Sequence, residues 1–151
     1  MIYLPQGYQL QKGVIKDRKL LVKFMELTYQ ELFPQRTDFS HLSKTVDQYL
    51  SPTTPLWWVT VSGEIIGGLW MGNAIDQVSG DRYGHIFLIY VTPEHRRQGI
   101  ATALIQVAED WVITRGDRRL GLQVFESNQP ALNLYDNLGF KTQSRLMFKS
   151  L

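Results

Sequence analysis

The sequence predicts a domain of the mixed α+β (α/β) class, in which helices and strands interleave around one sheet. Two observations lead to this class. Two helical segments precede a strand pair that is rich in β-branched and aromatic residues, and a strand, a glycine-containing loop and a long amphipathic helix follow later. The 151 residues suit one hydrophobic core, and no repeat, low-complexity stretch or linker divides them, so residues 1–151 are expected to form a single domain.

The first half is expected to contain one strand, two helices and a hairpin. Asp17 and Ser40 can cap helices, and Pro34 ends the first helix because proline disfavours helical backbone in the residue before it. The turn Ser62-Gly63-Glu64 separates two runs of strand-forming residues. The expected elements are a strand over residues 8–15, helices over 17–33 and 40–50, and hairpin strands over 56–61 and 65–75.

The second half alternates strands with helices. Residues 85–91 are apolar on both faces, which is typical of a central, buried strand. The next helix carries an apolar stripe from Ile100 to Val112, and Gly116 ends it. The order is completed by a strand over residues 118–125, a helix from Asn128 or Ser127 to Gly139 with Pro130 in its first turn, and a last strand over 140–148.

The composition excludes several function classes. A formal net charge of +2 is too small for a nucleic-acid-binding face, and without cysteine there is no disulfide, thiolate nucleophile or cysteine-ligated metal. His41, His85 and His95 lack ligand spacing, so no metal site is expected. The N-terminus has no basic n-region, and no apolar run is long enough to cross a bilayer. The sequence therefore predicts a soluble, cytoplasmic protein that binds neither nucleic acid nor membrane.

Residues 96–101, Arg-Arg-Gln-Gly-Ile-Ala, connect the buried strand to the long helix. The first backbone N–H groups of a helix have no intrahelical partner, and the helix dipole adds partial positive charge there. Gly99 lets a phosphate approach the backbone, Ala101 leaves room beside it, and Arg96 and Arg97 supply charge. So short a pattern also describes an ordinary solvated helix start, and it is the position between strand and helix that favours an anion site.

Two segments carry a resemblance to a known family. Residues 91–101 match the loop pattern Q/R-x-x-G-x-G/A through Arg96, Gly99 and Ala101. Residues 128–140 match the pattern N-x-x-A-x-x-L-Y-x-x-x-G-F. With both patterns in order and at the usual spacing, the chain resembles the GNAT superfamily of N-acetyltransferases.

The resemblance implies a fold and a co-substrate. It implies a mixed, mostly antiparallel sheet with about four flanking helices, splayed between the fourth and fifth strands to admit the pantetheine of acetyl-CoA. A bulge near residues 89–91 would offer backbone groups to the pantetheine, and backbone N–H groups of the loop would hold the pyrophosphate. The residues expected to bind acetyl-CoA are Ile89, Tyr90, Val91, Arg96, Arg97, Gln98, Gly99, Ile100, Ala101, Thr102, Asn128, Ala131 and Leu134.

Amide formation from an amine and a thioester needs a base and an acid. A lysine-like amine, with a pKa of about 10.4, must lose a proton, and a leaving thiolate, with a pKa of about 8.5, benefits from a donor. Tyr135 stands at the position of the family's tyrosine acid, and Asn128 either contacts the cofactor or caps the helix. His85 replaces the glutamate of many relatives, and it is either the base, directly or through water, or a half-exposed residue at a strand end.

The hairpin and two polar loops contain the candidate residues for binding the acceptor amine. One of Trp57, Trp58 and Trp70 could line an acceptor pocket, and family analogy makes residues 34–40 and 76–84 acceptor-side loops. The favoured reaction is direct transfer to the primary amine of a small molecule in a ternary complex. The alternatives are transfer to a protein N-terminus or lysine, a non-catalytic acyl-CoA-binding regulatory domain, and an interaction module that binds another anion. Family members are often dimers, so a homodimer is one open state.

Overall fold

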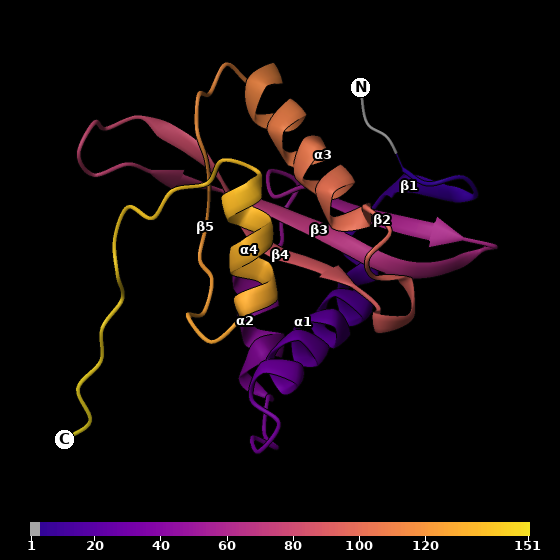
Figure 1. Ribbon diagram of the computed structural model, residues 1–151, viewed down its shortest axis with the longest axis horizontal. Helices are drawn as coiled ribbons and strands as arrows, with labels where there is room; N and C mark the ends of the chain where they lie inside the picture. The colour runs from indigo at the N-terminus through magenta and orange to yellow at the C-terminus, as the bar shows by residue number, and fades with distance from the viewer. Residues whose placement is uncertain (1–3) are drawn as a thin grey trace.

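The computed structural model describes residues 4–151 and contains one five-stranded sheet with helices on both faces (Figure 1). The strands lie in the order β1-β2-β3-β4-β5, and all neighbours are antiparallel except β4 and β5. This arrangement confirms the predicted fold class. The elements are β1 (Tyr8–Lys12), η1 (Ile15–Asp17), α1 (Arg18–Leu32), α2 (His41–Tyr49), β2 (Leu56–Val61), β3 (Glu64–Ile75), β4 (Arg82–Val91), η2 (Pro93–His95), α3 (Ile100–Thr114), β5 (Leu120–Leu122) and α4 (Gln129–Asn137).

The sheet separates two hydrophobic cores. α3 covers one face, where Leu104 packs with Leu69 and the other buried residues of β3 and β4. α1 and α2 cover the opposite face, where Phe24 and Trp58 meet edge to face with ring centroids 5.6 Å apart. None of the helices in residues 4–151 combines the length and the apolar character that crossing a membrane requires.

β2 and β3 form the predicted hairpin. Ser62 and Gly63, with φ of 50° and 78°, adopt the left-handed backbone that a two-residue turn between twisted strands requires. Trp57 lies near Trp111 of α3, whereas Trp58 points into the other core, as the alternation of a strand predicts. Trp58 and Trp70 are only 0% and 1% exposed, so these two residues belong to the core and line no open acceptor pocket.

The starts of α1 and α2 differ in detail from the prediction. Neither Asp17 nor Ser40 caps its helix through its side chain. Asp17 instead accepts two hydrogen bonds of 2.9 Å, one from the backbone N–H of Val14 and one from Nε1 of Trp58. The carboxylate of Asp17 therefore accepts the hydrogen bond of the buried Trp58 indole nitrogen. A capping pattern in the sequence does not reveal this role.

β4 carries a bulge at Phe87. Trp70 pairs with Leu88 and Met71 pairs with Ile86, so Phe87 is the extra residue. Pairing is regular over residues 89–91, where the resemblance implied a bulge. The predicted position of the bulge is therefore wrong by two residues. Gly72 accounts for the difference, because a Cβ atom there would lie 2.1 Å from the Phe87 ring.

The Gly72→Ala substitution is expected to destabilise the protein by about 1–3 kcal/mol, because the added methyl group must displace the packed Phe87 ring. Urea unfolding measures the change in free energy. In a Phe87→Leu background the loss should be smaller, since the shorter side chain leaves space. Equal losses in both backgrounds would contradict this packing constraint.

β4 and β5 pair over three positions and then separate. Residues 84–86 pair with residues 120–122, where β5 ends. The strand expected over residues 118–125 is therefore shorter, because residues 123–125 leave β4 instead of extending the ladder. From Phe87 to Val91, β4 has only β3 as a paired strand within residues 4–151. This separation is the splay that the resemblance implies.

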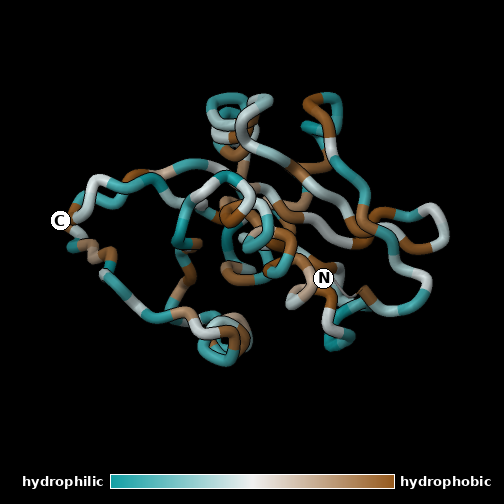
Figure 2. The backbone as a smooth tube through the Cα atoms, turned by 90° about the horizontal axis from the view of Figure 1, so that it is seen from above, coloured by the Kyte–Doolittle hydropathy of each residue, from teal (hydrophilic) through white to brown (hydrophobic). Residues whose placement is uncertain are grey.

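The C-terminal tail, residues 141–151, forms no strand. The sequence predicts a strand over residues 140–148, but these residues have no regular secondary structure, and every residue of the tail is exposed. Figures 1 and 2 show the tail extending away from the sheet to a C-terminus at the edge of the molecule. Strand formation here requires a partner strand and an apolar surface, and the tail contacts neither.

Candidate active site

The loop between β4 and α3 presents free backbone N–H groups beside the separated strands. Arg97 and Gly99 have left-handed backbone, with φ of 61° and 83°, and Gly99 is the N-cap of α3. Glycine has no side chain to cap the helix, and no acceptor among residues 4–151 meets the N–H groups of residues 97–102. Gln98 and Gly99 are exposed, so an anion can reach these groups.

Arg96 is bound within the protein. Its Nε donates to the carbonyl oxygen of Val91 at 2.8 Å, and its two terminal nitrogens donate to both carboxylate oxygens of Glu31 in α1. The guanidinium carbon lies 5.6 Å from the centre of the Tyr90 ring. The hydrogen bond from Arg96 lowers the pKa of Glu31, and the one to Glu31 raises the pKa of Arg96. Arg96 thus ties the loop to α1, whereas Arg97 remains exposed.

The Glu31→Gln substitution is expected to raise the KM for acetyl-CoA about fivefold with little change in kcat. The amide keeps the shape of the carboxylate but loses the charge. The side chains of Arg96 and Glu31 are 35% and 51% exposed, which limits the loss to about 1 kcal/mol. Steady-state kinetics with Glu26→Gln, on the same helix, as the matched control measures the effect. An unchanged KM would show that this ion pair does not position the loop.

α4 supplies Asn128 and Tyr135. The Oδ1 of Asn128 accepts a hydrogen bond from the N–H of Ala131 at 3.3 Å, so Asn128 caps the helix. Tyr135 is half-buried on the α3 side of the sheet, with its ring centroid 5.5 Å from that of Phe140. Burial raises the pKa of Tyr135, so its hydroxyl is protonated at pH 7 and can donate a proton.

His85 lies on the opposite face of the sheet from Tyr135. A Cβ atom at the neighbouring Gly84 would meet Val112 of α3, so His85 faces the α1–α2 side, where its ring lies 5.6 Å from Phe87. Burial lowers the pKa of His85, so the ring is neutral at pH 7 and one of its nitrogens can accept a proton. The two catalytic candidates are therefore separated by the sheet.

The last turn of α1 reaches both sides of the opening between β4 and β5. Glu31 binds Arg96 after β4, whereas Tyr29 and Phe33 pack edge to face on Phe125 after β5, with ring centroids 6.1 and 5.0 Å apart. The sequence did not point to a role for Glu31 or the three aromatic residues, because a helical pattern does not reveal which distant segments the partly exposed face of the helix contacts. Aromatic residues that gather at a helix end and a strand end were the available signal.

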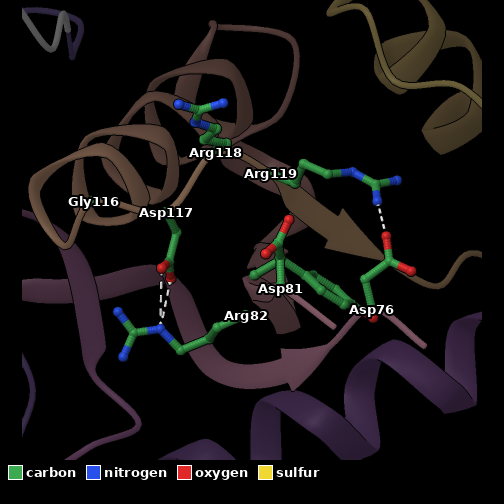
Figure 3. Close-up of a pocket in the computed structure, with 8 residues that line it drawn as sticks. Asp76, Asp81, Arg82, Gly116, Asp117, Arg118 and Arg119 are labelled. Carbon is green, nitrogen blue, oxygen red and sulfur yellow. Dashed lines mark hydrogen bonds and ion pairs between the residues drawn. The ribbon is translucent and has the colours of Figure 1, made fainter. Parts of the chain in front are cut away.

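A charged cavity of about 290 Å³ lies at the other end of β4 (Figure 3). The ion pairs Arg82–Asp117 and Arg119–Asp76 cross it and join the β3–β4 turn to the α3–β5 turn. The 10 residues of β4 span about 33 Å, so the cavity is far from the loop at residues 96–101. Residues 76–84, expected as an acceptor-side loop, lie at this end of β4 directly before His85, and the ion pairs fix their position. The cavity is lined by Asp76, Asp81, Arg82, Tyr83, Gly116, Asp117, Arg118 and Arg119.

Metal ligands are not grouped in the described part of the chain. No set of three or more His, Cys, Asp or Glu side chains within residues 4–151 is placed to hold an ion. The groups near the opening that can carry chemistry include the backbone N–H donors of residues 97–102, the Tyr135 hydroxyl and the His85 imidazole.

Comparison with known proteins places this geometry in a family. The model of the acetyltransferase (GNAT) family matches residues 21–140. The N-alpha-acetyltransferase of Sulfurisphaera tokodaii is 28% identical over 141 residues, covering 89% of this chain and 80% of that protein. Human N-acetyltransferase 8 is 30% identical over 113 residues, which are 74% of this chain, and the match spans only 48% of the human protein.

A solved structure has the same fold. The GCN5-related N-acetyltransferase from Ralstonia eutropha JMP134 superposes with a TM-score of 0.77 at 24% identity, covering 95% of this chain and 99% of that one. The family match includes both the phosphate-type loop and the segment with Tyr135. The chain therefore belongs to the GNAT family of N-acetyltransferases.

Proposed function

We propose that the protein transfers the acetyl group of acetyl-CoA to a primary amine by direct attack in a ternary complex. The observation that carries this proposal is the opening between β4 and β5, with the uncapped start of α3 beside it. A pantetheine arm needs exposed strand backbone, and a pyrophosphate needs free N–H groups. Both are available on one side of the sheet.

The cofactor-binding residues divide into backbone and side-chain contributors. The side chains of Tyr90 and Val91 are buried, so these residues and Ile89 would bind pantetheine through their backbone. The N–H groups of residues 97–102 would bind the pyrophosphate, and Arg97 would add charge. Arg96 would act indirectly, by holding the loop. At α4, the side-chain Nδ2 of the N-cap Asn128 and the half-buried Ala131 and Leu134 would complete the site, since the backbone N–H of Asn128 is already bonded to the carbonyl oxygen of Phe125.

The separation of His85 and Tyr135 suits the two proton transfers. The amine would approach from the α1–α2 face, where His85, directly or through water, would accept its proton. The nitrogen would bond to the thioester carbonyl carbon, and the C–S bond would break. Tyr135, on the α3 face, would donate a proton to the departing sulfur. With base and acid on opposite faces, each proton transfer would take place on its own side of the opening.

A small amine is the favoured acceptor. The last turn of α1 crosses the opening and packs on Phe125, which narrows the approach for a folded protein surface. A structural neighbour with a TM-score of 0.70, AAC(6′)-Iy, is solved with a bisubstrate analogue of CoA and acetylneamine, which supports the same reaction class. Another neighbour, with a TM-score of 0.74, is a ribosomal-protein-alanine N-acetyltransferase, so a protein N-terminus is the second candidate.

An acceptor panel tests the proposal. Release of free CoA from acetyl-CoA would be followed with aminoglycosides, polyamines, amino acids, N-terminal peptides and lysine peptides, and the acetylated product would be identified by mass spectrometry. Turnover with small amines at a kcat/KM at least tenfold above peptides would support the proposal. Tight acetyl-CoA binding with no product from any acceptor would favour a non-catalytic binding domain. No binding of CoA at all would overturn the proposal.

A further inference from the structure

The loop between β4 and α3 also contacts β1, through the side chain of Tyr8. The Tyr8 hydroxyl oxygen lies 2.6 Å from Nδ1 of His95 and 3.1 Å from Oε1 of Gln98. The rings of Tyr8 and His95 meet edge to face, with centroids 5.6 Å apart. Neither of these two residues has a part in the proposed function, although both lie against the loop that would hold the pyrophosphate.

Tyr8 is held at its backbone and at its ring. Its N–H donates to the carbonyl oxygen of Pro5 at 3.1 Å, and it pairs with Val61 of β2 in the sheet. Its ring is partly buried against the α3-side core. A side chain that is packed in this way loses little further conformational entropy when its hydroxyl forms a hydrogen bond. The hydroxyl is therefore a fixed point against which the loop can be positioned.

The hydroxyl of Tyr8 has a single hydrogen, so it can donate to only one of its two neighbours. It donates to Oε1 of Gln98, and its oxygen is then free to accept the hydrogen on Nδ1 of His95. The orientation of the Gln98 amide follows from this arrangement, because Oε1 faces Tyr8 and the donor end, Nε2, points elsewhere. Nε2 has no hydrogen-bond partner among residues 4–151, and the side chain is exposed.

The backbone of the loop is strained next to Gln98. Arg97 has a φ of 61°, a left-handed conformation that costs free energy for a residue with a side chain and persists only where the surrounding structure holds it. Contacts hold the loop on both sides, because Arg96 binds Glu31 of α1 and Gln98 binds Tyr8 of β1. The amide of Gln98 therefore has a defined position beside the free N–H groups at the start of α3.

We propose that Tyr8 and His95 orient the Gln98 amide so that its Nε2 donates to the pyrophosphate of acetyl-CoA. This inference rests on the proposed function, because it takes the start of α3 as the phosphate site. The amide would add a side-chain donor to the backbone N–H groups of residues 97–102, and a hydrogen bond to a charged acceptor is stronger than one between neutral groups. A reversed amide would instead direct its carbonyl oxygen at the phosphate and repel it. Tyr8 and His95 are positioning residues, since only Gln98 would touch the phosphate.

A double-mutant cycle on CoA binding tests whether Tyr8 acts through Gln98. Calorimetric titration would compare the wild type with Tyr8→Phe, Gln98→Ala and the double variant. Gln98→Ala should weaken binding about tenfold, and Tyr8→Phe, whose ring keeps the packing, about fivefold. The double variant should bind about as Gln98→Ala does, because without the amide the Tyr8 hydroxyl has nothing to orient. Tyr49→Phe, at the end of α2, is the matched control and should bind CoA as the wild type does.

The outcomes of the cycle separate this inference from the proposed function. A wild type that does not bind CoA would overturn both. Wild-type binding that Tyr8→Phe leaves unchanged would overturn the role of Tyr8 alone. Losses that multiply in the double variant, to about 50-fold, would mean that Tyr8 acts independently of Gln98, and the proposed orientation would be rejected.

Gln98→Glu tests which end of the amide meets the phosphate. Glutamate keeps an acceptor for the Tyr8 hydroxyl but has no donor and carries a negative charge. Binding of CoA should therefore be weaker than in Gln98→Ala, because the carboxylate repels the pyrophosphate. An affinity equal to that of the wild type would show that Gln98 donates nothing to the phosphate, and the proposal would be rejected.

Two variants at His95 test the second hydrogen bond of the Tyr8 hydroxyl. Leucine has no donor, whereas asparagine has an Nδ2 donor close to the position of Nδ1 in histidine. His95→Leu should weaken CoA binding about threefold, and His95→Asn should recover most of that loss. Equal losses in both variants, or no loss in either, would show that His95 does not orient the Tyr8 hydroxyl.

Discussion

Gly99→Glu is expected to weaken CoA binding by about 100-fold or more, equivalent to about 2.7 kcal/mol. The substitution places a carboxylate among the N–H groups at the start of α3, where it can occupy the position of a phosphate and repel the others. It also places a side chain on a residue with φ of 83°, which L-residues rarely adopt. Calorimetric titration with CoA measures the loss.

The matched control is Gly99→Gln. Glutamine has the same size and the same backbone requirement as glutamate but no charge, so the ratio of the two dissociation constants isolates the electrostatic part. A Cβ atom at Gly99 meets no atom within 4 Å, so neither variant should disturb the core. If both variants bind CoA as the wild type does, the start of α3 is not the phosphate site.

Tyr135→Phe is expected to lower kcat about 100-fold while the KM for acetyl-CoA changes less than threefold, the lower end of the range for general acid catalysis. The variant removes only the hydroxyl, and the half-buried ring still packs against Phe140. Because burial raises the pKa of Tyr135, the acid should stay protonated through the neutral range, and wild-type kcat should not fall with rising pH until well above pH 9.

Tyr49→Phe is the matched control for the hydroxyl. Tyr49 ends α2 and is 45% exposed, and it has no part in the proposed mechanism, so loss of its hydroxyl should leave kcat unchanged. A Tyr135→Phe enzyme that acetylates the amine panel at the wild-type rate would remove Tyr135 from the mechanism. A fall in kcat with both variants would instead indicate a general effect of losing a tyrosine hydroxyl.

Sequence patterns correctly predicted the elements whose structure depends on residues close to one another in the chain. The Ser62-Gly63 turn, the apolar stripe of α3 and the glycine before it depend on neighbours in sequence, and all three are where the sequence places them. The resemblance to the family also predicted that β4 and β5 separate. The position of the bulge was predicted wrongly because it depends on Gly72, in the neighbouring strand, making room for the Phe87 ring.

The partners of Arg96 lay beyond the reach of sequence patterns. A basic residue in a phosphate-type loop suggests a phosphate ligand. The N–H groups of Arg96 instead donate to Glu31, 65 positions earlier in the chain, and to the carbonyl oxygen of Val91. The tail shows the same limit in another form. Its residues favour a strand, yet a strand needs a partner, and within one copy of the chain the tail has none.

The two attachments of the last turn of α1 differ in their response to ionic strength. The attachment after β4 is the partly exposed ion pair of Glu31 and Arg96, which salt screens. The attachment after β5 is the contact of Tyr29 and Phe33 with Phe125, which salt does not weaken. Added salt should therefore loosen α1 from the loop at residues 96–101, whereas α1 should stay packed beside Phe125. The ionic strength of the solution would then control how firmly α1 holds the β4 side of the opening.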